Sequence, residues 1–134
     1  MSARLDETLG TAGFDNLING TNPPAEVFSV TIRKGSTAAS YKRGTVLALS
    51  AGTGGDGKRV ILGTTARSNE TLTANAILTE DVEVGASADA VAVAYRTGHF
   101  NSNGLIVASG YTFTAADKEA LRSVGILISD AVAV

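Results

Sequence analysis

Cysteine and tryptophan are absent from the 134-residue sequence, and histidine and methionine occur once each. Without cysteine the chain forms no disulfide, no thiolate metal site and no cysteine nucleophile. A single histidine excludes a metal centre built from several imidazoles and leaves at most one catalytic arrangement that depends on histidine. We therefore expect a fold held by packing alone, with no cofactor and no metal.

Charged residues are also scarce, at 18% of the chain against about 25% in an ordinary protein. The formal net charge of −2 gives no basic surface for a phosphate backbone, so nucleic acid is not an expected partner. No apolar run approaches the ~18 residues that a membrane-spanning helix needs, and the first ten residues lack a signal-peptide core. The sequence predicts a soluble protein made in the cytoplasm, with no membrane partner.

Small residues take the place of the missing ones: the chain has 21 Ala, 15 Gly, 15 Thr and 12 Val. This composition argues against a helical bundle, which is richer in Leu, Glu, Lys and Arg. Short strands joined by many turns fit it better, and the length favours a single core. We expect one mainly β domain over residues 26–134.

Period-two alternation and short apolar runs mark the expected strands. Thr97–Asn101 is turn-rich, and Asn103-Gly104 is a two-residue turn signal. The expected strands cover Val27–Arg33, the hairpin Thr45–Ser50 with Lys58–Thr65, the apolar run Leu72–Val84, Ala90–Arg96, and a last short strand from Ile126.

One short helix is expected over residues 115–124. Thr114 is a capping residue, and Asp117 three positions later completes a variant of the capping box. Apolar and charged side chains then fall on opposite faces, and Gly125 ends the helix.

Residues 1–25 differ from the rest of the chain. Single apolar residues are separated by Gly, Asn and Asp, and Pro23-Pro24 closes the segment with an extended break. We interpret it as a flexible N-terminal arm that docks onto another molecule; a frayed terminus without a role is the alternative. The apolar residues of the arm are Leu5, Leu9, Phe14, Leu17 and Ile18.

Three features have the form of a chemical site. Residues 52–58 match the spacing G-x-x-x-x-G-K of a phosphate-binding loop, but Arg59 stands where that motif needs Ser or Thr, and a strand-like run follows. His99 could act as a catalytic base, but the sequence has no G-x-S-x-G motif to supply the nucleophile. Glu80, Asp81 and Glu83 alternate with valines, as on a solvated strand face. We therefore expect residues 52–58 to form a hairpin loop, His99 to lie on the surface or at a subunit contact, and the three acids to lie on a solvated face. With no catalytic site among these features, we do not expect an enzyme.

Four segments in the second half of the chain carry a family resemblance: Ala76–Val82, Ala92–Asn101, Phe113–Asp117 with Leu121-Arg122, and Gly125–Ser129. In these segments the chain resembles the head decoration proteins of tailed bacteriophages, a family typified by the lambda protein. Residues 33–63 fit the earlier hairpin of that family.

The resemblance implies a β-clip-like incomplete barrel of bent ribbons. It implies a homotrimer on the outer surface of the expanded capsid, whose N-terminal arms bind the major capsid protein and cement the head. The five apolar arm residues are then the expected capsid contacts, and Ala92, Ala94, His99 and Phe100 the expected trimer contacts. A head-fibre or tail protein, or a small β-fold hydrolase centred on His99, is the alternative.

Overall fold

The computed structural model describes residues 17–20 and 23–129, and it is mainly β, as the sequence predicts. Its one α-helix, α1, spans Ala115–Ser123, close to the expected bounds. A single 3-10 turn covers Ser102–Gly104. The strands are β1 (Ile18–Gly20), β2 (Glu26–Ile32), β3 (Ala39–Tyr41), β4 (Val46–Ala51), β5 (Arg59–Ile61), β6 (Thr71–Leu78), β7 (Val82–Val84), β8 (Ala90–Asn101) and β9 (Ile126–Ser129).

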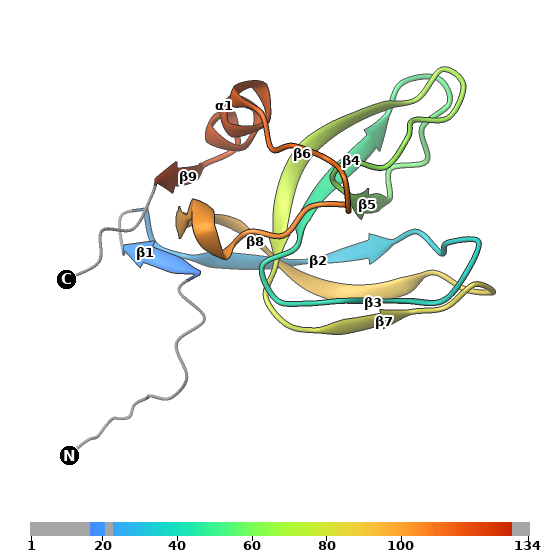
Figure 1. Cartoon of the computed structure of the whole chain (residues 1–134), viewed down its shortest axis with the longest axis horizontal. Coiled ribbons are helices and arrows are strands. Elements are labelled where there is room, and N and C mark those ends of the chain that lie inside the picture. Colours follow the sequence, from blue (N-terminus) through green and yellow to red (C-terminus); the bar gives the residue numbers. More distant parts are fainter. Residues whose placement is uncertain (1–16, 21–22, 130–134) are drawn as a thin grey trace, which may run out of the picture.

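Five strands form a barrel-like sheet in the order β8-β2-β5-β4-β6, with β6 pairing back to β8 (Figure 1). The antiparallel pairs β2–β8 and β4–β6 are long, whereas β6 and β8 share only Ile77↔Tyr95 and Leu78↔Ala94. The parallel pair β2–β5 has the single register Ile32↔Arg59. Two long ribbons thus meet along short seams, which agrees with the expected incomplete barrel of bent ribbons.

The core has two clusters, one on each face of β4 and β6. Val46 and Ile77 belong to the first cluster, and their neighbours Leu47 and Leu78 belong to the second. Because successive strand residues face opposite sides, these two strands are buried on both faces. That burial explains why their sequences are nearly continuous apolar runs rather than clean alternations.

The prediction of a turn over Thr97–Asn101 is wrong, because this segment is the end of β8. Gly98 has a φ of +147°, a conformation that glycine tolerates and other residues avoid. The hydrogen bonds that make the segment a strand come from distant parts of the chain: Asn101 N donates to Leu17 O at 2.7 Å, and Gly98 N donates to Gly125 O at 3.2 Å. Asn103-Gly104 lies in the 3-10 turn rather than in a hairpin.

Candidate functional site

The last four residues of β8 lie between β1 and β9, and we call these three segments the terminal sheet. Phe100 pairs with Ile18 of antiparallel β1 on one side and with Ile128 of parallel β9 on the other (Figure 1). The first and last described strands therefore flank the same stretch of β8. The first described segment therefore joins the rest of the structure at this sheet.

The structure places the five expected capsid contacts in different surroundings. Leu17 is 1% exposed and belongs to the first core cluster, so its side chain is fixed inside its own chain. Ile18 is 44% exposed, one of the few large apolar side chains on the surface. Leu5, Leu9 and Phe14 lie outside the described residues.

Three of the four expected trimer contacts are interior residues of the chain. Ala92, Ala94 and Phe100 are each no more than 5% exposed, and the Phe100 ring packs at 5.1 Å from the ring of Tyr95. The small alanine side chains of β8 therefore fit against the chain's own sheet, in the second core cluster. Only His99 is half-buried and keeps exposed surface.

His99 is held by the terminal sheet. Its Nε2 lies 2.7 Å from Ser129 Oγ on β9, and the ring lines a cavity of about 330 Å³ next to α1. Glu119 lines the same cavity, but its carboxylate pairs with Arg122 at 2.6 Å. Within residues 17–20 and 23–129, no carboxylate bonds the imidazole, so the third group of a nucleophilic triad is not in place.

The glycine-rich segment 52–57 is the loop between the antiparallel strands β4 and β5, which confirms the hairpin prediction. A strand follows it, so no helix N-terminus faces a phosphate. Asp56 in the loop accepts from Arg33 Nε at 3.0 Å, and this bond holds the pKa of the carboxyl well below its usual range. The loop therefore directs a carboxylate at Arg33 and Arg67, and these two cations are already paired and not left for a phosphate.

Glu70 is a buried acid beneath this loop, and the sequence did not predict its burial. The side chain of Glu70 is fully buried; it accepts from the backbone N–H of Arg67 at 2.8 Å and also bonds Ser50 and Arg33. These donors, the Arg67 N–H first, lower the pKa of Glu70 to about 2. No local pattern marks Glu70, because its two side-chain partners, Ser50 and Arg33, lie 20 and 37 residues away in the sequence. The arrangement fixes the β4–β5 loop to the barrel.

The acidic segment 80–83 behaves as its alternation predicts. Glu83 on β7 is exposed and Val84 beside it is 2% exposed. Asp81 Oδ1 accepts from the backbone N–H of Arg43 at 2.8 Å. In the described part of the chain, no group of three or more His, Cys, Asp or Glu residues is placed to hold a metal ion. None of the helices there is long and apolar enough to cross a membrane.

A protein-family model described as Bacteriophage lambda head decoration protein D matches residues 9–127. The match spans both halves of the barrel, the helix and the first half of β9, so it covers nearly all of the described fold. A comparison with curated proteins gave no match.

Proposed function

The chain belongs to the family of the bacteriophage lambda head decoration protein D, a structural phage protein family and not an enzyme family, and we propose that it cements the capsid. Membership implies a structural protein of the phage head, located in the virion. The proposal adds that the protein binds the outer surface of the expanded capsid as a homotrimer. Its partners are then the major capsid protein and two further copies of itself.

The observation that supports an arm mechanism is the burial of Leu17. Because this side chain is 1% exposed in the core, the chain is fixed to the barrel immediately before β1. We therefore propose residues 1–16 as the capsid-binding arm, shorter than the 1–25 expected from the sequence, with Leu5, Leu9 and Phe14 as its anchors. Ile18, with 44% of its surface exposed, extends the same contact from the body of the protein.

An extended arm binds by adding a strand to a capsid element, through main-chain hydrogen bonds and apolar side-chain contacts. Each buried anchor stabilises the contact by about 1.5 to 3 kcal/mol before the cost of ordering the arm is subtracted. A trimer presents three arms at once, so weak individual contacts combine into tight binding. Since this protein would bind only the assembled shell, its binding would stabilise that shell by mass action. Of the residues expected at the trimer contact, His99 alone has surface to offer, and we place it at the edge of that contact.

Deletion of residues 1–16 tests the arm. The truncated protein keeps Leu17 and β1, so we expect a folded barrel with an unchanged circular dichroism spectrum that no longer adds to expanded, undecorated heads. Copies per shell are counted by electron microscopy.

A second, full-length variant replaces Leu5, Leu9 and Phe14 together by Ser. It keeps the length of the arm and removes its apolar anchors, so it separates the effect of the anchors from the effect of shortening the chain. It is also expected to leave heads bare. Normal decoration by both proteins would disprove the arm mechanism, and no decoration by the unaltered chain would disprove the proposed function itself.

A further inference from the structure

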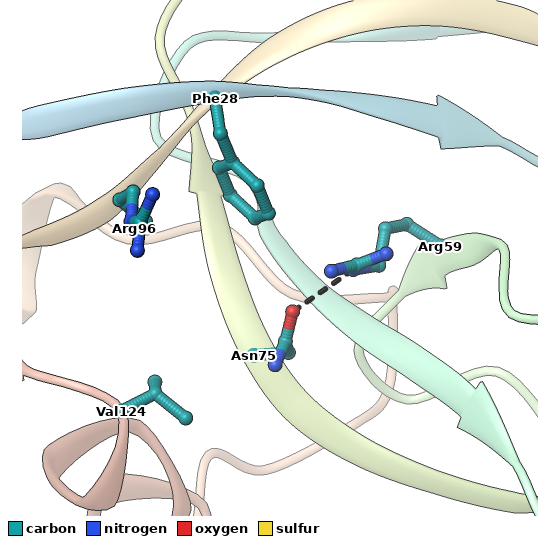
Figure 2. A pocket seen from close by; sticks show the side chains of 5 residues that line it. All are labelled: Phe28, Arg59, Asn75, Arg96 and Val124. Atoms are coloured by element: carbon teal, nitrogen blue, oxygen red, sulfur yellow. Dashed lines mark hydrogen bonds between the residues drawn. The ribbon is translucent and has the colours of Figure 1, made fainter.

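A second cavity, of about 280 Å³, opens among β2, β5, β6, β8 and the C-terminal end of α1. Figure 2 shows one residue from each of these elements around it: Phe28, Arg59, Asn75, Arg96 and Val124. We call it the arginine pocket. Two of its five residues are cations in a chain with more acids than bases.

Both guanidinium groups lie against the same aromatic ring. The Cζ atoms of Arg59 and Arg96 are 5.5 Å and 6.0 Å from the centroid of Phe28, within the range of a cation–π contact. Arg59 Nε also donates to Asn75 Oδ1 at 2.9 Å (Figure 2), which leaves the amide NH2 of Asn75 as a further donor. The pocket therefore combines one cation held by a hydrogen bond, Arg59, a second and more exposed cation, Arg96, and an amide donor around an apolar ring.

Neither arginine has a carboxylate partner within residues 17–20 and 23–129. Five other described cations form ion pairs with carboxylates: Arg33, Lys42, Lys58, Arg67 and Arg122. Arg59 is half-buried as well, and this burial lowers its pKa. A partly desolvated cation without an anion is costly, and a bound carboxylate removes that cost through charge-assisted hydrogen bonds.

We propose that the arginine pocket binds a single carboxylate side chain, supplied by the acidic segment 80–83 of a second copy of the chain. Glu80 and Glu83 are exposed and have no ion pair in the described part of the chain, so their charges complement those of the pocket. The segment leads into β7, and in Figure 1 the β3–β7 ribbon and α1 lie on opposite sides of the barrel. The pocket and the acidic segment of one copy therefore face different neighbours.

A contact between two different surfaces of identical subunits is heterologous, and such a contact closes into a ring when the rotation permits. The source of the carboxylate thus rests on the homotrimer proposed above, whereas the pocket's preference for a carboxylate does not. Phe28 and Val124 supply apolar contact for the methylene groups of a glutamate, and the two guanidinium groups supply bidentate hydrogen bonds to its oxygens.

The ligand class is tested by NMR on the isotope-labelled full chain. The probe is a blocked peptide with the sequence of residues 79–84, and the matched control peptide, called the Gln peptide, carries Gln in place of both glutamates and Asn in place of Asp81, so that it has no carboxylate. We expect saturable shifts of the amide signals of Phe28, Arg59, Asn75 and Arg96 with the acidic peptide. The shifts should fall about tenfold with the Gln peptide or with the Arg96→Gln protein. Equal shifts with both peptides, no shifts at all, or shifts with inorganic phosphate alone would overturn the proposal.

The source of the carboxylate is tested by charge reversal in the whole chain. Two variants are compared with the unaltered chain: Arg96→Glu alone, and Glu80→Lys together with Glu83→Lys. Each should lower the affinity with which copies form trimers on heads about tenfold, and the chain with all three changes should regain that affinity. Lys34→Glu, an exposed reversal at a residue that lines neither cavity, serves as the control and should leave trimer formation unchanged. Failure of the triple variant to recover would overturn the second copy as the source. If the unaltered chain does not bind heads, the proposed function fails, while the peptide titration still decides the ligand class.

Discussion

Gly98 is the residue at which β8 leaves the barrel and enters the terminal sheet. Its φ is +147°, and a Cβ at this position would lie 2.6 Å from Cζ of the Phe100 ring. Both facts make the position specific for glycine, because an L side chain would be strained and would collide with a fully buried ring.

Replacing Gly98 by Ala should therefore destabilise the fold by about 3 kcal/mol, from backbone strain and the displaced Phe100 ring. The free energy of unfolding in urea measures the effect. Gly85→Ala is the matched control: nothing lies closer than 4.0 Å to the added Cβ, and its backbone has no positive φ, so a change within about 0.5 kcal/mol is expected. Equal losses in the two variants would contradict the assigned role of Gly98.

Glu70 makes the fold sensitive to acid. Its folded-state pKa of about 2 lies below the ordinary value of 4.5, so its contribution to stability is present above pH 4.5 and is lost as the pH falls toward 2. We expect Glu70→Gln to lower Tm at pH 7 and to flatten the fall of Tm between pH 5 and pH 2. Part of the fall should remain, because Arg33 also holds the pKa of Asp56 low.

Tm measured by circular dichroism across that pH range is the test. Glu83→Gln, which alters an exposed carboxylate without an ion pair in the described residues, should keep the dependence of the unaltered chain. A slope unchanged by Glu70→Gln would show that the buried carboxylate is not what the fold loses in acid.

At the scale of elements, α1 is short and depends on its cap. Thr114 Oγ1 accepts from Asp117 N at 3.1 Å, and Asp117 Oδ2 accepts from Thr114 N at 3.0 Å and from Tyr111 Oη at 2.6 Å. A helix of this length is marginal alone, so the cap and the burial of Leu121 hold it on the barrel.

Thr114→Ala should cost about 1 kcal/mol of unfolding free energy, since it leaves the backbone N–H of Asp117 without its side-chain acceptor. Hydrogen exchange of the α1 amides should rise with it, which locates the effect in the helix. Thr112→Ala, also exposed but outside the capping box, is expected to change neither quantity. A silent Thr114→Ala would mean that tertiary packing alone fixes the helix.

The elements that the sequence predicts well are those whose signals are local. The capping box at Thr114 marks the start of α1, and alternation marks β2. The expected single strand Leu72–Val84 is instead two strands, β6 and β7, because β6 pairs with β4 and β7 pairs with β3. The end of β8 was missed because its strand partners are β1 and β9, which are distant in sequence. The arginine pocket was missed for the same reason, since it draws one residue from each of five elements. Long-range pairing leaves no periodic trace in a local stretch of sequence.

At the scale of the whole molecule, the two core clusters share β4 and β6, and this sharing should make unfolding cooperative. Ile77→Ala removes contacts from the first cluster and Leu47→Ala from the second, and both residues are 0% exposed. Each change should destabilise the protein by about 2 to 5 kcal/mol. In both variants the methyl signals of Val60 and Val30, one from each cluster, should still disappear at one urea concentration.

Separate transitions for Val60 and Val30 would show instead that the barrel and its covering segments unfold as independent units. The matched control is Val91→Ala, because Val91 is 76% exposed and its truncation should move neither transition.

The terminal sheet also has a topological consequence. Because Ile18 and Ile128 both pair with Phe100, the first and last strands lie two strand spacings apart, about 10 Å. A short linker from the end of β9 to the start of β1 would therefore close the chain into a ring. New ends opened at exposed Gly57, where an added Cβ would meet no atom within 4 Å, would give a circular permutant. Such a permutant would retain the barrel without a free amino terminus beside β1, and would thus separate the shape of the molecule from the order of its sequence.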